Sequence, residues 1–166
     1  MTLSRRAVLT GVVATACAHT EPTPNFRTFR SWLPRQTALG QPFAPERLDG
    51  HVVMVTFIAT WCFPCLADLR TLDSLAEQYG PKGFQAVLVG MDLEGDLVLA
   101  PFAQQLKSAA PVLIADERLR AGNTPFGKIR ELPSRFIFNR EGDLIGAFAG
   151  VTTPKELSDA IAPLFR

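Results

Sequence analysis

The chain has 166 residues, the size of one domain, and its 47% share of hydrophobic residues excludes an intrinsically disordered protein. With 17 basic and 16 acidic residues the formal net charge is +1, so no basic excess is present to bind nucleic acid. No apolar run approaches the roughly 20 residues of a membrane-spanning helix, which excludes a polytopic membrane protein.

Residues 1–20 predict an export signal. Arg5 and Arg6 precede a short apolar stretch, which ends in the small residues Ala14-Thr15-Ala16 before Cys17. This ending resembles a bacterial lipoprotein box, in which the Cys17 thiol accepts a lipid, and it also fits ordinary cleavage after an Ala-x-Ala site. Lipidation would leave the two remaining cysteines as a pair. The alternative is the amphipathic N-terminal helix of a cytosolic protein.

A tether is expected over residues 21–35. Pro22, Pro24 and Pro34 break regular structure there, and few apolar residues recur periodically. The remaining residues, 36–166, are expected to form one domain, because the sequence indicates neither an internal repeat nor a second domain.

The first part of this domain predicts a strand–helix–strand unit. Residues 51–58 are nearly all apolar or β-branched, as in a central strand covered on both faces. An amphipathic helix follows over residues 64–79, and Gly80-Pro81 ends it. Residues 84–91 predict a second buried strand, and this order of elements implies parallel pairing.

The second part predicts a helix over residues 97–109, a short strand over 111–115, a β-hairpin formed by 134–138 and 144–148, and an amphipathic helix over 154–165. Thr153 stands at the N-cap position of the last helix. The predicted fold class is therefore α/β: a central mixed sheet flanked by helices, built from a βαβ unit, a hairpin and a C-terminal helix.

Two cysteines, Cys62 and Cys65, fall where the first buried strand meets its helix. A thiolate at a helix N-terminus faces unpaired backbone N–H groups and the positive end of the helix dipole, so the anion is stabilised there. Cys65 lies one turn further on, close enough to form a disulfide with Cys62. The sequence thus predicts Cys62 as the exposed nucleophile and Cys65 as the buried resolving thiol of a thiol–disulfide exchange centre.

Three other interpretations of this cysteine pair remain. It could be half of a zinc site, for which only His19, His51 and Cys17 remain as further ligands, and residues 17 and 19 are expected outside the domain. It could also be a static disulfide, or two thiols packed in the core.

Residues 50–65, which read GHVVMVTFIATWCFPC, resemble the active-site stretch of the TlpA/ResA-like branch of thioredoxin-fold proteins. The segment Ala59-Thr60-Trp61-Cys62 is especially typical of that branch. Residues 132–142 resemble the cis-proline loop of the family and the hairpin that follows it. The two motifs in this order are far more specific than Cys-x-x-Cys alone. The resemblance covers residues 35–166 and implies a thioredoxin fold.

The resemblance implies roles for further residues. Pro133 is expected to be cis and to pack against the disulfide, and Leu132 to offer backbone groups to an extended substrate peptide. Trp61 is expected to cover the pair and to line the binding surface, while Phe63 and Pro64 tune the redox potential. The alternative for Pro133 is a trans proline at the start of a strand.

The sequence departs from the family pattern at several positions. Thr56 stands where many thioredoxins carry a buried acid, and its hydroxyl cannot act as a base. Asp68 matches an acidic position common in this branch and is a candidate for assisting proton transfer; the alternative is a solvated helix charge. Arg70 replaces a proline that kinks this helix in relatives, so the kink is not implied here. Ile58 replaces a frequent aromatic residue, which is a change of packing.

The leading hypothesis is an extracytoplasmic thiol–disulfide oxidoreductase that reduces disulfides of client proteins, such as apocytochrome c or copper-site proteins, as relatives do. A membrane electron donor would feed it, and no cofactor or metal is expected. We expect a monomer that lies in the periplasm or on the outer face of a membrane and is anchored by a lipid.

The alternatives are an oxidant that installs disulfides, a peroxiredoxin-like peroxidase, a copper-binding metallochaperone and a redox-silent binding module. Val55 and Ala59 stand where the peroxidase pattern has proline and threonine, and no histidine follows His51, although a metallochaperone would usually have one late in the chain.

Overall fold

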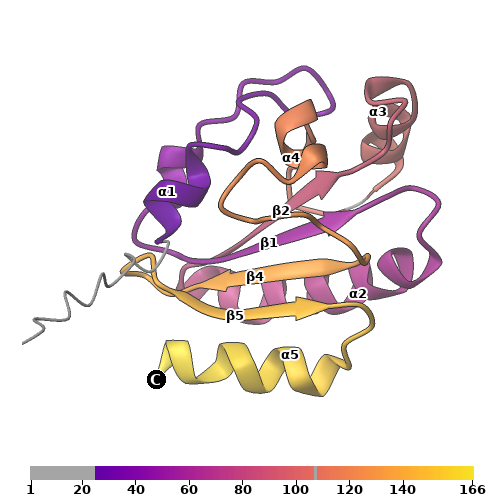
Figure 1. Ribbon diagram of the computed structural model, residues 1–166. Helices are drawn as coiled ribbons and strands as arrows, with labels where there is room; N and C mark the ends of the chain where they lie inside the picture. The colour runs from indigo at the N-terminus through magenta and orange to yellow at the C-terminus, as the bar shows by residue number, and fades with distance from the viewer. Residues whose placement is uncertain (1–24, 107) are drawn as a thin grey trace, which may run out of the picture.

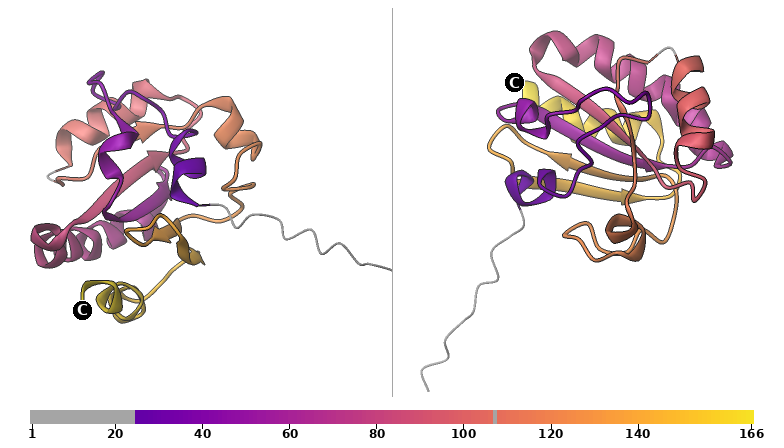
Figure 2. Two further views of the ribbon diagram at one scale, coloured as in Figure 1. Left: turned by 90° about the vertical axis from the view of Figure 1, so that its left-hand side faces the viewer. Right: turned by 90° about the horizontal axis from the view of Figure 1, so that it is seen from above.

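The computed structural model describes residues 25–106 and 108–166, which form a five-stranded mixed sheet with helices on both faces (Figures 1 and 2). The strand order is β3-β2-β1-β4-β5. The strands are β1 (Val52–Ile58), β2 (Phe84–Gly90), β3 (Val112–Ile114), β4 (Ser134–Phe138) and β5 (Leu144–Ala149). The longer helices are α2 (Phe63–Tyr79), α3 (Asp96–Gln105) and α5 (Pro154–Ile161). The predicted α/β fold class is confirmed.

The central strand β1 is buried along its whole length, as its apolar and β-branched sequence predicts. It pairs in parallel with β2, where Val55 faces Val87, and antiparallel with β4, where Val55 faces Phe136. Because α2 connects β1 to β2 and β4 pairs antiparallel with β5, the predicted βαβ unit and hairpin are both present. The ends of β1 and β2 and the start of β4 meet at the same edge of the sheet, and the cysteine pair lies there.

Two apolar cores cover the two faces of the sheet. Leu72 of α2 and Ile161 of α5 pack against one face. On the other face, Phe29 packs edge-on against Phe126, with ring centroids 4.5 Å apart, and also contacts Phe138. Edge-to-face aromatic pairs of this kind contribute about 0.5–1.5 kcal/mol beyond the area they bury. This second core accounts for much of the chain's phenylalanine.

The structure corrects the tether expected over residues 21–35. From residue 25 onward this segment belongs to the domain: α1 (Phe26–Arg30) buries Phe26 and Phe29, which are 3% and 1% exposed, and Leu33 is 3% exposed. The three apolar residues recur at helical spacing, a signal masked by the polar and proline-rich residues around them. Residues 21–24, the predicted export signal over 1–20 and Cys17 lie outside the described residues.

Smaller differences concern element ends. The predicted helix over 97–109 is shorter, and α4 (Glu117–Ala121) forms where the sequence reads as mixed. The last predicted helix continues from α5 as a 3-10 turn over Ala162–Phe165. Thr153 is the predicted N-cap, and it forms a capping box with Glu156. Within residues 25–106 and 108–166, no helix has the length and apolar character needed to cross a membrane.

Candidate active site

The cysteine pair sits where β1 leads into α2. Cys62 is the N-cap of α2, and the backbone N–H of Cys65 donates a hydrogen bond to Cys62 Sγ over 3.2 Å. The two residues form a disulfide, with Cα atoms 5.2 Å apart. Because the first N–H groups of a helix have no intrahelical acceptor, the sulfur of Cys62 receives the donor that stabilises a thiolate once the disulfide is reduced.

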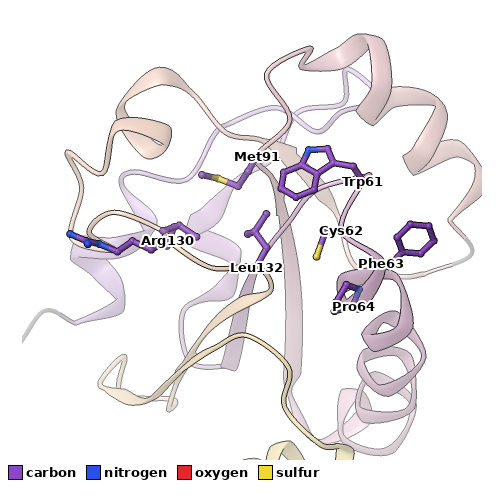
Figure 3. A pocket seen from close by; sticks show the side chains of 8 residues that line it. Trp61, Cys62, Phe63, Pro64, Met91, Arg130 and Leu132 are labelled. Atoms are coloured by element: carbon purple, nitrogen blue, oxygen red, sulfur yellow. The ribbon is translucent and has the colours of Figure 1, made fainter.

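The structure corrects the expectation that Cys62 is exposed. Its exposed fraction is 5%, and that of Cys65 is 1%. Cys62 nevertheless lines the floor of an open cavity of about 570 Å³, whereas Cys65 does not (Figure 3). A partner sulfur must therefore enter this cavity to reach Cys62, and the attack by Cys62 before Cys65 stays a prediction.

Apolar side chains form most of the cavity. It is lined by Trp61, Cys62, Phe63, Pro64, Met91, Ile129, Arg130 and Leu132. Trp61 lines the cavity as expected but is 68% exposed, and Phe63 at the first position of α2 is 84% exposed. Figure 3 shows Met91, Trp61 and Leu132 around the Cys62 sulfur, while Phe63 and Arg130 point outward on opposite sides. The walls can therefore hold an apolar segment beside the disulfide.

The Leu132–Pro133 peptide bond is cis, as the resemblance implies. Pro133 precedes β4, and the pairing of Phe57 with Ser134 places it beside the end of β1. The backbone N–H of Gly150 donates to the Pro133 carbonyl over 2.8 Å, which ties this loop to the end of β5. Leu132 forms the cavity wall opposite the start of α2 (Figure 3).

Asp92 fixes the loop that precedes the cysteines, and the sequence interpretation missed it. It follows β2, is 1% exposed, and accepts hydrogen bonds from the Thr60 backbone N–H over 3.1 Å and from the Thr60 hydroxyl over 2.6 Å. The signal that could have revealed Asp92 is an acidic residue directly after a buried strand, at the edge of the sheet where β1 also ends.

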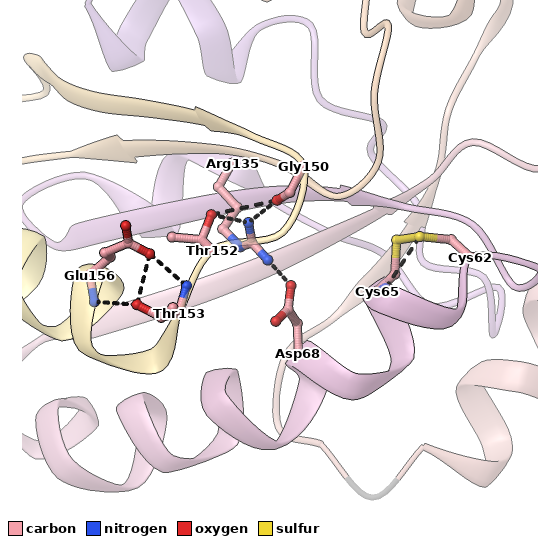
Figure 4. Close-up of polar contacts among 8 residues, drawn as sticks. All are labelled: Cys62, Cys65, Asp68, Arg135, Gly150, Thr152, Thr153 and Glu156. Atoms are coloured by element: carbon pink, nitrogen blue, oxygen red, sulfur yellow. Dashed lines mark hydrogen bonds and ion pairs between the residues drawn. A yellow bond between two sulfur atoms is a disulfide. The ribbon is translucent and has the colours of Figure 1, made fainter.

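Asp68, one turn of α2 beyond Cys65, pairs with Arg135 (Figure 4). Arg135 is 1% exposed and also donates to the Gly150 carbonyl over 3.1 Å and to the Thr152 hydroxyl over 3.0 Å. Burial lowers the pKa of the Arg135 guanidinium from its ordinary value. The interpretation of Asp68 as a solvated helix charge is wrong, because its carboxylate is held by a buried cation.

Thr56, at the position of the buried acid of many thioredoxins, pairs with Arg135 in the register of β1 and β4. Its hydroxyl is buried and has no hydrogen-bond partner among the described residues. The charged pair near the disulfide therefore consists of Asp68 from α2 and Arg135 from β4. The sequence interpretation identified the first of these and missed the second.

Within the described residues, the fold brings no further zinc ligands to the cysteine pair. Among the residues that the structure describes, no group of three or more histidine, cysteine or acidic side chains could hold a metal ion. His51 precedes β1, whereas Cys62 follows it, so the two residues lie toward opposite edges of the sheet.

These features define a thioredoxin-fold protein with a disulfide at the start of α2 and a cis-proline beside it. The fold matches the crystal structure of a thiol:disulfide interchange protein, thioredoxin family protein from Chlorobium tepidum TLS, with a TM-score of 0.67 and 24% identity over 79% of this chain and 91% of that one. It also matches the pneumococcal exposed lipoprotein thioredoxin from Streptococcus pneumoniae strain TIGR4, with a TM-score of 0.64 and 19% identity over 77% of this chain and 96% of that one.

The chain belongs to the Redoxin family, whose model matches residues 18–163. A similar curated protein is the thiol-disulfide oxidoreductase ResA of Bacillus thuringiensis (strain Al Hakam), which is 26% identical over 118 residues. The matched region covers 71% of this chain and 66% of that protein, so the chain spans just under two thirds of the relative's length. The resemblance to the TlpA/ResA-like branch is thereby confirmed.

Proposed function

We propose that this protein is a thiol–disulfide oxidoreductase in which Cys62 and Cys65 alternate between dithiol and disulfide. One observation carries the proposal: the disulfide lies at the N-terminus of α2, with Cys62 alone on the floor of an open, largely apolar cavity. The ResA relatives, named as thiol-disulfide oxidoreductases, support the same chemistry.

In the reducing direction, the Cys62 thiolate attacks one sulfur of a client disulfide. A mixed disulfide forms, and the other client sulfur leaves as a thiolate that takes a proton from solvent. Cys65 then loses its proton and attacks Cys62 Sγ, which releases the second client thiol and restores the Cys62–Cys65 disulfide. Two electrons thus pass to the client, and a donor thiol pair must return them.

The chain's own groups divide this work. The Cys65 N–H supports negative charge on Cys62 Sγ at each stage in which that sulfur is a thiolate. Trp61, Phe63, Pro64 and Leu132 hold the client segment, and the backbone beside Pro133 aligns it in extended form. Asp68, paired with Arg135, positions α2 against β4 in this scheme.

We further propose where in the cell the protein acts and with which partners. An export signal over residues 1–20 with lipid on Cys17 would put the domain in the periplasm or on the outer face of a membrane. There a membrane electron donor would reduce it, and clients such as apocytochrome c or copper-site proteins would be its substrates. Two proteins of similar fold support this location: a secreted disulfide oxidoreductase from Mycobacterium tuberculosis and the exposed lipoprotein thioredoxin from Streptococcus pneumoniae.

The reduction potential of the full-length protein tests the proposal, measured by equilibration with glutathione and read by the fluorescence of Trp61. A value near or below about −230 mV supports a reductant, and a value near about −120 mV instead indicates an oxidant that installs disulfides. Without a reversible transition, the exchange chemistry is wrong. C62S should abolish insulin reduction, whereas C65S should accumulate a mixed disulfide.

A further inference from the structure

Four large apolar side chains are exposed on the cavity lining or on the segment that leads into α3. Trp61 and Phe63 are 68% and 84% exposed. Leu93, just before α3, and Leu97, in its first turn, are 83% and 78% exposed. We call these four residues the apolar rim. Large apolar side chains that gather on a surface mark sites of interaction, because leaving them in water is unfavourable.

The fold brings the two halves of this rim together. β1 and β2 are parallel, so the segments that follow them leave the sheet at the same edge, as Figure 1 shows. Asp92 joins these segments through its hydrogen bonds to Thr60. Leu93, the next residue in the chain, is thus held beside the segment that carries Trp61.

Exposed side chains of opposite charge belong to two different segments near the cavity, the one that follows β2 and the one that precedes β4. Glu94 and Asp96 lie between the two leucines of the apolar rim in the chain and are exposed. In the segment before β4, Arg130 lines the cavity, with its guanidinium directed away from Cys62 (Figure 3), and Lys128 is exposed close by in the chain. None of the ion pairs formed within the described residues involves any of these four side chains.

We propose that the site selects client segments in which apolar residues flank the reactive cysteine, with a basic side chain on one side of it and an acidic one on the other. The apolar neighbours would cover the apolar rim, the basic side chain would face Glu94 and Asp96, and the acidic one would face Arg130. This inference rests on the proposed exchange reaction and names the class of substrate at the same site. The two charges fix the direction in which a client crosses Cys62.

Two capped pentapeptides test the charge preference. One has the sequence Lys-Leu-Cys-Leu-Glu, the other has lysine and glutamate exchanged, and each cysteine sulfur is bonded to thionitrobenzoate. In a single turnover with the reduced full-length protein, Cys62 attacks the peptide sulfur and the nitrobenzoate thiolate leaves. Cys65 then displaces the peptide as a thiol and the Cys62–Cys65 disulfide forms. The released chromophore gives the second-order rate constant.

One of the two peptides is expected to react about three- to tenfold faster, because exposed charge pairs make small but measurable contributions to binding. The preference should shrink as salt is added, because exposed charges are screened. E94K/D96K/R130E should reverse it, while the matched control E77K, at the far end of α2, should leave it in place. Equal rates for the two peptides, or a preference that survives the triple reversal, would overturn the proposal.

The apolar part has its own test. L93S/L97S should slow both leucine-flanked peptides about fivefold and should slow a serine-flanked peptide less, because less apolar area is buried there. L39S, in a turn at the opposite edge of the sheet, is the control. Equal slowing of all peptides contradicts the role of the rim. No chromophore release from any peptide by the wild-type protein would instead contradict the proposed exchange reaction itself.

Discussion

Asp92 shows how one buried side chain can fix an irregular loop. Residues 59–62 lie between β1 and α2, so the Thr60 N–H takes part in neither the sheet nor the helical hydrogen bonds. The Asp92 carboxylate supplies acceptors for both Thr60 donors and is itself shielded from water, with 1% of the residue exposed. The direction in which Trp61 and Cys62 leave β1 therefore depends on a residue just after the neighbouring strand, β2.

Replacing this carboxylate should loosen the site. D92A leaves the Thr60 N–H and hydroxyl without their acceptor, and we expect the free energy of unfolding to fall by about 1–3 kcal/mol, with slower exchange at Cys62. Urea denaturation and insulin reduction measure the two effects. D92N, which keeps one carbonyl oxygen, should lose less; a D92A protein as stable as the wild type would show that the loop is fixed by other contacts.

Between elements, the Asp68–Arg135 pair joins α2 to β4 and, through Gly150 and Thr152, to the segment that leads into α5. Removing only one partner of a buried pair leaves the other without compensation. R135M should lower the free energy of unfolding by about 3–5 kcal/mol. D68L/R135M should recover most of that loss, because an apolar pair of similar volume needs no charge partner.

Urea denaturation of the two single variants and the double variant measures the coupling between Asp68 and Arg135. If the double variant loses the sum of the two single losses, the two side chains act independently and the pair is not what joins these elements.

The capping box of α5 makes the free energy of unfolding depend on pH in the acidic range. Hydrogen bonds from the Thr153 hydroxyl and backbone N–H lower the pKa of Glu156 below its ordinary value of 4.5. Because the folded-state pKa is the lower one, the stabilisation is complete above about pH 4.5 and is lost as pH falls through the folded-state value. The difference in unfolding free energy between wild type and E156Q should therefore be constant near neutral pH and decline in acid. A difference that grows in acid would contradict this assignment.

At the scale of the whole molecule, the domain needs its N-terminal segment. Phe29 is 1% exposed and contacts Phe126 and Phe138 in the second core. F29A should cost about 3–5 kcal/mol in unfolding free energy. A chain that starts at residue 36 should fail to show a cooperative urea transition, whereas one that starts at residue 25 should unfold cooperatively. Equal stability of the two truncated chains would restore the tether interpretation.

The main elements could be predicted because their sequence patterns extend over many residues. The continuous apolar run of β1, the helical spacing in α2 and the turn before β5 each act over many residues, and the Cys62–Cys65 spacing is local. The five-residue α1 falls below the length at which periodicity is clear. Asp92 binds Thr60, and Arg135 binds Asp68. In both pairs the partners are distant in the sequence, so no local sequence pattern indicates the contact. β4 is also buried at Arg135, so simple alternation misplaces that residue.

The place where the described chain begins has a consequence for orientation. Asn25 bridges to Asp143 in the turn between β4 and β5, at the edge of the sheet opposite the one that carries Cys62. The seven residues of β1 separate these edges by about 23 Å. The eight residues from Cys17 to Asn25 span at most about 28 Å when fully extended. A lipid on Cys17 would thus hold the sheet edge at Asn25 nearer the membrane, with the disulfide directed toward the aqueous side, where it can meet soluble clients. To react with an electron donor within the bilayer, the domain would first have to reorient so that the disulfide faces the membrane.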